Sequence, residues 1–322
     1  MIEGVFMSGN KTQFKGIFML LLTAFIWGSS FVAQSVGMEQ VEAFTFNGIR
    51  TLLGALVLLP FILVRDSISG KKMTAVQKSA RKALDKKTLV YGSFLGIALC
   101  AASNFQQFAF NYSTPGKIAF ITALYMFFVP LFGIFLKKKV SLLTWLCVMA
   151  GFVGLYFLCI NPEDITAINK GDVLTFICAI LYAVHILLVE RFAPDVDGVK
   201  LSCVQFAVSG AVSCVLMFIF ETPQLQAIYA VIVPIVYAGV MSCGIAYTFQ
   251  IIGQKYTEAT IASLIMCTES VFGVLCSAVV LHEILSGREI LGCSIMFAAI
   301  LLSQVADMIT AKLKTISQSR SH

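Results

Sequence analysis

The chain has 322 residues, of which 58% are hydrophobic and only 12% are charged. Soluble domains carry about 25% charged residues, so the composition excludes a soluble globular protein and predicts an integral membrane protein. The formal net charge of +6 does not indicate nucleic-acid binding, because the basic residues lie between apolar runs, where they report membrane topology.

Ten apolar runs are long enough to cross a bilayer, which takes about 20 mainly apolar residues per helix. They cover residues 14–34, 42–64, 88–110, 116–136, 140–160, 171–191, 199–220, 227–252, 258–281 and 288–308. Pro130 lies inside the fourth run and should kink that helix, because proline removes an intrahelical hydrogen bond. The sequence therefore predicts an all-α membrane protein with ten transmembrane helices, flanked by tails at 1–13 and 309–322.

Lysine and arginine predict the orientation of these helices. Only Lys117, Lys170 and Arg288 fall in connections on one side, whereas the other side holds the basic loop Arg65–Lys87 and both tails. Because cytoplasmic loops of membrane proteins carry an excess of basic residues, we expect a multi-pass plasma-membrane protein with both termini in the cytoplasm.

The two halves of the chain repeat each other. At a constant offset of 144 residues, Phe105 recurs as Phe249, Gln106 as Gln250 and Tyr112 as Tyr256. Earlier in the chain the offset is 155, because the loop Arg65–Lys87 has only a short counterpart in the second half. Each repeat, 14–160 and 161–308, holds five spans, and five is odd, so the second copy must be inverted. Inverted repeats are typical of transporters with a midplane site.

Two segments resemble a known family. The opening of the first span, TAFIWGSSFV, and the ending VVLHEILSGREILGCSIMFAAILL are similar to the EamA family of the drug/metabolite transporter superfamily. That family usually has Gly-Glu before its last span. This chain has His282-Glu283 there, and Lys138-Lys139 at the matching place of the first repeat. The resemblance implies a central cavity lined mainly by spans 1–4 and 6–9, with spans 5 and 10 peripheral, and the export of amino acids or related metabolites.

Three ionisable residues lie well inside predicted spans, where charges are costly and usually functional. Glu269 is the candidate coupling residue: it could exchange a proton or cation, or pair with a substrate amine. Arg50 could bind a substrate carboxylate, because a guanidinium forks onto two oxygens. For both, a purely structural pairing is the alternative. His185 could line the cavity or serve as a hydrogen-bonding group between helices.

Polar and aromatic side chains add candidates for a cavity lining. Asn104 and Gln107 share one face of the third span with Asn111, and Tyr247 and Gln250 share one face of the eighth with Gln254. Amide bonds between helices are the alternative role for these stripes.

Three aromatic residues, Trp27, Tyr125 and Tyr182, lie at depth within their spans. Tyr125 occupies the repeat position of Glu269, and Trp27 that of Tyr182. Such rings could stack on a substrate or simply fill the core.

These features favour a secondary transporter that exports a small metabolite such as an amino acid. Two alternatives stay open, namely proton-coupled efflux of lipophilic cations and a structural membrane subunit without transport activity. No catalytic or nucleotide-binding motif is found, so an enzyme is not expected. The ten cysteines lie in apolar segments without zinc-ligand spacing, so neither a metal nor a cofactor is expected. The expected partners are the lipid bilayer, a small-molecule substrate and, as one alternative, protons. A monomer or a weak homodimer fits the sequence.

Overall fold

The computed structural model describes residues 2–70, 73–138, 140–160, 168–281 and 286–319. The first half forms α1 (Ile2–Met38), α2 (Ala43–Gly70), α3 (Ala75–Ala109), α4 (Pro115–Thr122), α5 (Tyr125–Phe135) and α6 (Leu142–Cys159). The second half forms α7 (Lys170–Phe192), η2 (Ala193–Asp195), α8 (Gly198–Phe220), α9 (Leu225–Ala230), α10 (Ile232–Tyr237), η3 (Ala238–Tyr247), α11 (Thr248–Gly253), α12 (Ala259–Met266), α13 (Glu269–Leu281) and α14 (Gly287–Ser319).

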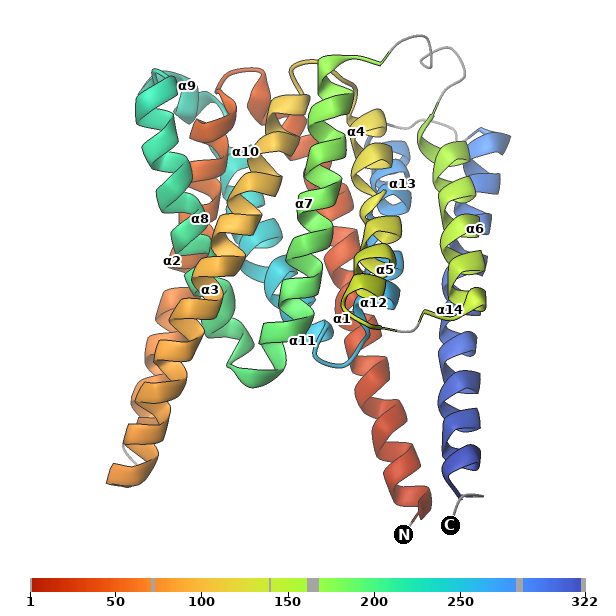
Figure 1. Cartoon of the computed structure of the whole chain (residues 1–322). Helices are drawn as coiled ribbons and strands as arrows, with labels where there is room; N and C mark the ends of the chain where they lie inside the picture. The colour runs from red at the N-terminus through yellow and green to blue at the C-terminus, as the bar shows by residue number, and fades with distance from the viewer. Residues whose placement is uncertain (1, 71–72, 139, 161–167, 282–285, 320–322) are drawn as a thin grey trace.

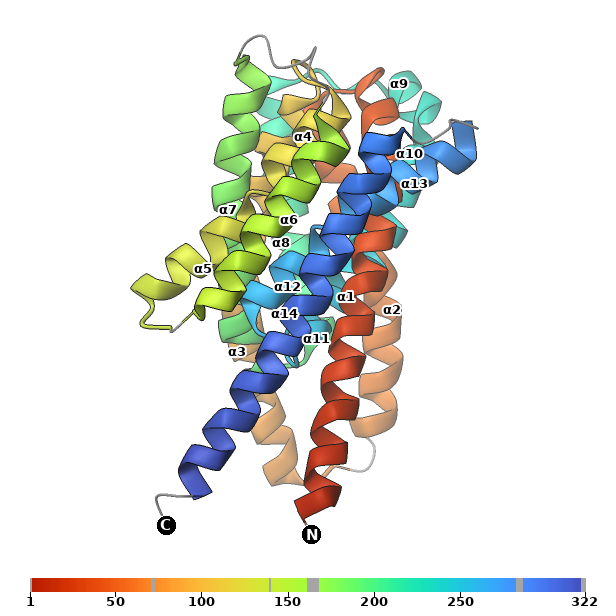
Figure 2. The same ribbon diagram turned by 90° about the vertical axis from the view of Figure 1, so that its right-hand side faces the viewer.

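These helices account for the predicted spans, several of which are divided into shorter helices. Within the described residues, nine helical segments are long and apolar enough to cross a membrane. The tenth predicted run lies in α14, which packs along α6 at one edge of the bundle (Figures 1 and 2). Helices suit this environment because every backbone polar group must find its partner internally when no water is present.

Helix-capping residues explain where several helices begin. Thr74 and Gln77 form a reciprocal capping box at the start of α3, and Asn169 and Asp172 form another at the start of α7. Ser141 accepts a hydrogen bond from the backbone of Thr144 at the start of α6. Such caps satisfy backbone N–H groups that the first helical turn leaves without partners.

The fourth and ninth spans are each broken into two helices, where the sequence predicted continuous ones. The first break lies at Ala123–Leu124 and the second at Cys267–Thr268. The sequence predicted a kink at Pro130; α5 runs through Pro130, and the interruption of the span lies before Tyr125. Both breaks lie in the largest hydrophobic core, which includes Ala123 and Cys267.

Helix pairing follows the internal repeat. The contacts of α3 with α7 and α8 correspond to those of the eighth span (η3 and α11) with α1 and α2. Likewise, α1 packs against α13 as α7 packs against α4 and α5. The second and seventh spans, α2 and α8, pack on each other, as do the fifth and tenth. This is the pairing expected of two inverted copies related by a pseudo-two-fold axis.

Polar contacts join α2 and α8 at both of their ends. At one end the Glu221 carboxylate accepts hydrogen bonds from the backbone N–H groups of Phe44 and Thr45, both 2.7 Å long. At the other end Asp197 caps α8 and lies 3.0 Å from the Arg65 guanidinium. Burial raises the pKa of Asp197, but the hydrogen bonds from the Lys200 backbone and from Arg65 outweigh it and hold the pKa below its ordinary value of 3.8.

Both ends of the chain lie on the same side of the bundle. Figure 1 shows the first turns of α1 and the last turns of α14 projecting at the same end of the bundle as the end of α2 and the start of α3.

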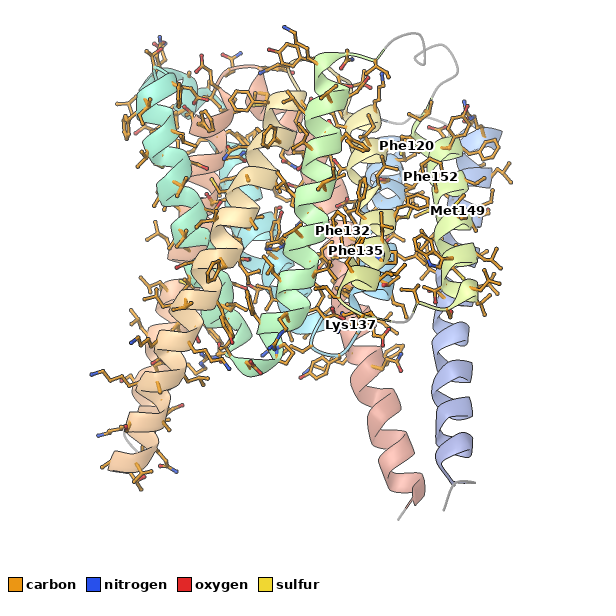
Figure 3. All side chains as sticks on the ribbon, in the orientation of Figure 1. Phe120, Phe132, Phe135, Lys137, Met149 and Phe152 are labelled. Carbon is orange, nitrogen blue, oxygen red and sulfur yellow. The ribbon has the colours of Figure 1, made fainter. Side chains whose placement is uncertain are left out.

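Aromatic packing joins the fourth span to the fifth. Phe120 of α4 and Phe152 of α6 point towards each other with ring centroids 5.3 Å apart (Figure 3).

Candidate functional site

A small cavity lies between the two repeats, beside the breaks in the fourth and ninth spans. The first repeat contributes Trp27, Phe31, Gln34, Arg50, Gln106, Thr122 and Tyr125. The second repeat contributes Tyr182, Ile186, Ser242, Tyr247, Gln250 and Glu269. The cavity has a volume of about 40 Å³, which is room for only a few water molecules.

Repeat-related residues face each other across this cavity. Gln106 and Gln250 are equivalent at the offset of 144, as are Tyr125 and Glu269, and Trp27 and Tyr182 are equivalent at the offset of 155. All six line the cavity. The pseudo-two-fold axis therefore runs through this site, and the charged residues break its symmetry, because the repeat partner of Glu269 is the neutral Tyr125.

Arg50 is a buried cation at the cavity. It lies in α2 with 4% of its surface exposed. Its guanidinium is 5.4 Å from the ring centroid of Phe46, and its Nε atom has no hydrogen-bond partner among the described residues. It forms no salt bridge with any side chain that the structure describes. A buried charge is costly unless it is paired, so this guanidinium is suited to receive an anionic group.

Glu269 is the first residue of α13, directly after the break in the ninth span. It is 4% exposed and lines the same cavity as Arg50. The two residues do not form a salt bridge in the described structure. Tyr125, at the equivalent position in α5, has a buried hydroxyl and lines the same cavity. The cavity thus presents a carboxyl group, a guanidinium and a phenolic hydroxyl.

Close helix contacts at two glycines hold both charged residues in place. A Cβ atom on Gly28 of α1 would lie 2.4 Å from the backbone oxygen of Glu269. A Cβ atom on Gly239 of η3 would lie 2.9 Å from the backbone oxygen of Arg50. Small residues let membrane helices approach closely. A larger residue at either glycine would therefore displace the neighbouring helix, which carries Glu269 or Arg50.

Aromatic rings and a chain of hydrogen bonds form the remaining wall. The rings of Trp27 and Tyr247 have centroids 4.6 Å apart. The Tyr247 hydroxyl donates to the Tyr182 hydroxyl, and this in turn donates to Gln106 Oε1, both over 3.3 Å. Gln106 Nε2 donates to the Thr122 hydroxyl at 3.1 Å. The chain of hydrogen bonds therefore links the second repeat to the first across the cavity.

Three of the residues predicted from sequence do not line this cavity. Asn104 bonds to Asn47 and Ser213 at 2.9 Å, and so joins three helices.

His185 Nε2 lies 3.0 Å from Gln205 Oε1. Gln107 Nε2 donates to the backbone oxygen of Gln34 at 3.4 Å. Asn104, Gln107 and His185 therefore form hydrogen bonds between helices, which is the alternative role that the sequence left open for them. The other seven predicted residues, Trp27, Arg50, Tyr125, Tyr182, Tyr247, Gln250 and Glu269, do meet at the cavity.

The EamA-like transporter family matches residues 14–160 and 169–304, which is nearly the whole chain. The chain belongs to the EamA-like transporter family. It is a multi-pass membrane transporter, and its fold is ten transmembrane helices in two inverted five-helix repeats, as the sequence predicted.

Relatives of this EamA-family chain carry names of the same general kind. An "uncharacterized transporter" of Archaeoglobus fulgidus is 26% identical over 293 residues, covering 88% of this chain and 83% of that protein. The "uncharacterized transporter YoaV" of Bacillus subtilis is 21% identical over 291 residues, covering 88% of this chain and 94% of that protein. A crystal structure of a protein with 17% identity superposes with a TM-score of 0.73, covering 90% of this chain and 96% of that one. This last likeness concerns the fold alone.

Sequence reasoning missed several cavity residues of this EamA-family transporter. Phe31, Gln34, Thr122, Ile186 and Ser242 carried no signal of their own.

Gln106 did carry a signal in the sequence, because it matches Gln250 at the repeat offset. The polar stripe on the third span nevertheless pointed to Gln107 as the cavity residue. Ser242 reaches the cavity on η3, a π-helix, whose wider turn shifts the register of the side chains that follow. The family-specific residues His282-Glu283 and Lys139 lie outside the described residues.

Proposed function

We propose that this EamA-family transporter exports a small zwitterionic metabolite, with an amino acid as the first candidate, by alternating access around the cavity between its repeats. Arg50 would bind the carboxylate of the substrate, and Glu269 would bind its amine or exchange a proton during transport. The end of the bundle that carries both termini and the basic α2–α3 connection would face the cytoplasm, as the positive-inside rule predicts.

The observation that carries this proposal is that a guanidinium and a carboxyl group, both buried and neither in a described ion pair, line one cavity. Neither Arg50 nor Glu269 has an ionic partner among the described side chains, although each is only 4% exposed. A ligand that carries both a carboxylate and an ammonium group would neutralise both residues at once. Charge-assisted hydrogen bonds of this kind are stronger than neutral ones.

The remaining lining supports a polar substrate of modest size. Trp27 and Tyr247 offer aromatic faces, on which an ammonium group can rest through a cation–π contact. The Nε1 atom of Trp27 and the Oε1 atom of Gln250 have no hydrogen-bond partners among the described residues. These atoms could bind polar groups of a substrate.

The small volume indicates a closed conformation. About 40 Å³ cannot hold an amino acid, so the helices around the cavity must move apart for substrate to bind. The symmetric pairing of the repeats supports such a movement, because two inverted halves can rock about a shared site and open it to either side in turn.

Proton-coupled efflux of lipophilic cations is the second candidate. The four aromatic residues Trp27, Tyr125, Tyr182 and Tyr247, together with Glu269, favour it. Arg50 opposes it, because a buried cation on the same cavity repels a positively charged substrate. Amino-acid export is therefore the better supported of the two.

Transport by purified protein in liposomes tests the proposal. Counterflow of each proteinogenic amino acid and of tetraphenylphosphonium would be measured with and without a pH gradient. We expect counterflow of one or more amino acids, which Arg50→Gln strongly reduces at substrate concentrations near the half-saturating value of the unaltered chain. Arg191→Gln, an exposed arginine at the end of α7, is the matched control and should transport normally. Counterflow of tetraphenylphosphonium without that of any amino acid would refute the proposal.

A further inference from the structure

The connection between α2 and α3 is the largest difference between the two repeats. It accounts for the change of the repeat offset from 155 to 144 residues, and it is rich in lysine and arginine. In Figure 1 the end of α2 and the start of α3 project together beyond the bundle. Because the second repeat builds the same five spans with only a short counterpart, this basic extension is not needed for the fold.

A groove of about 840 Å³ lies at the base of this extension. Small-molecule sites in proteins have volumes of about 300–1,000 Å³. Its floor is apolar and comes from three helices, with Leu59 and Ile62 of α2, Leu89 of α3, and Cys203 and Val204 of α8.

Its rim is basic. Ser79, Lys82, Lys86 and Leu89 follow each other at steps of three or four residues and so share one face of α3.

The acidic residues at the rim already have partners. Lys200 Nζ lies 2.7 Å from Asp66 and 2.6 Å from Asp85. Arg81 also forms a salt bridge with Asp66. Lys82 and Lys86 are exposed and form no salt bridge with a described side chain. The groove therefore keeps two positive charges that no described carboxylate offsets.

The apolar floor continues into the outer surface of the bundle. Leu59 and Leu89 of this floor are 42% and 56% exposed. In a chain that spans a membrane, such residues face the acyl chains. A molecule bound in this groove would therefore contact apolar side chains and lipid at the floor, and the Lys82 and Lys86 side chains at the rim.

We propose that this groove, lined by α2, α3 and α8, binds an anionic phospholipid, with the phosphate between Lys82 and Lys86 and an acyl chain along the apolar floor. Clusters of basic residues next to a transmembrane helix attract anionic lipids, each lysine contributing about 1 kcal/mol, which is about fivefold in affinity. A fully polar, water-soluble ligand would make no apolar contact with the floor of the groove.

Native mass spectrometry of the full chain from detergent micelles tests this site. The micelles would contain equal amounts of phosphatidylglycerol and phosphatidylcholine. We expect the protein to retain phosphatidylglycerol, and Lys82→Gln/Lys86→Gln to lower that affinity about 30-fold. The matched control is Lys15→Gln/Lys137→Gln, two exposed lysines of α1 and of the α5–α6 loop; Lys137 is labelled in Figure 3, away from the projecting ends of α2 and α3. The control should retain phosphatidylglycerol as the unaltered chain does.

A second variant tests the apolar half of the groove. Leu59→Trp keeps every charge and fills part of the floor, so it should also reduce retention of phosphatidylglycerol. Its thermal midpoint in detergent would show that it is folded. Equal retention of both lipids, or full retention by Lys82→Gln/Lys86→Gln, would overturn the proposal. Complete competition by soluble glycerol phosphate at the lipid concentration would also overturn it, because the site would then take a phosphate without its acyl chain.

Discussion

Cys267 and Ala123 meet at the centre of the molecule, where the Cys267 thiol donates to the Ala123 backbone oxygen at 3.6 Å across a sequence separation of 144 residues. This separation is the repeat offset, so each residue is the counterpart of the other. Each also marks the break of its span, between α4 and α5 and between α12 and α13. The two broken helices therefore touch at their equivalent points, on the pseudo-two-fold axis.

Enlarging Cys267 should disturb this contact. Cys267 has no exposed surface, and inserting bulk into a well-packed core costs about 1–3 kcal/mol. We expect Cys267→Phe to lower the thermal midpoint in detergent and to reduce transport. Cys276→Phe makes the same change at a half-buried position of α13 and should have a much smaller effect. Equal midpoints for the two variants would contradict tight packing at the axis.

The role of Arg50 can be separated from that of positive charge in general. A planar guanidinium forks onto a carboxylate, whereas an ammonium group acts as a point charge. We expect Arg50→Gln to raise the half-saturating concentration of substrate about 10- to 100-fold, and Arg50→Lys to lie between this variant and the unaltered chain. Transport assays over a range of substrate concentrations would measure both. If Arg50→Gln left the half-saturating concentration unchanged, Arg50 would not bind the substrate.

Glu269→Gln keeps the shape of the side chain and removes its titration. If Glu269 exchanges a proton, the variant should fold, lose accumulation driven by a pH gradient, and keep exchange of substrate for substrate. Glu258→Gln, an exposed position at the start of the same span, is the matched control. Normal accumulation by Glu269→Gln with an unchanged pH profile would assign the carboxyl a structural role and favour facilitated transport.

The glycine contact between α1 and α13 should be intolerant of a methyl group. Because a Cβ atom on Gly28 would lie 2.4 Å from the Glu269 backbone oxygen, Gly28→Ala must displace one helix. We expect the variant to lose transport and to unfold at a lower temperature. Gly133→Ala is the control, since its Cβ atom would make only ordinary contacts, 3.7 Å from the Lys138 side chain. A fully active Gly28→Ala would show that α1 and α13 can separate without loss of function.

Cysteine labelling of intact cells tests the proposed orientation. Ser67 lies near the end of α2 on the basic side, and Gln40 lies in the connection between α1 and α2 on the opposite side. In a background without reactive native cysteines, Ser67→Cys should react only with membrane-permeant maleimides. Gln40→Cys should also react with impermeant ones. The opposite pattern would reverse the orientation.

The sequence by itself determined the number of membrane spans and the inverted repeat. The number of spans follows from hydropathy, because each transmembrane helix must bury about 30 Å of apolar length in the bilayer. The repeat followed from residues such as Gln106 and Gln250 at a constant offset, and it placed Tyr125 opposite Glu269. These are local or periodic properties, which can be read without knowing how the helices pack.

Only the tertiary structure decided which polar residues face the cavity. The stripe on the third span pointed to Asn104 and Gln107, but neighbouring helices take up their amides, and Gln106 lines the cavity instead. The breaks before Tyr125 and Glu269 also have no sequence signal, because neither glycine nor proline stands at Ala123–Leu124 or Cys267–Thr268. Both outcomes depend on contacts between different helices, which join residues 57 to 144 positions apart in the sequence. The direction in which a polar side chain points inside a membrane is set by the partner that satisfies it, and that partner belongs to another helix.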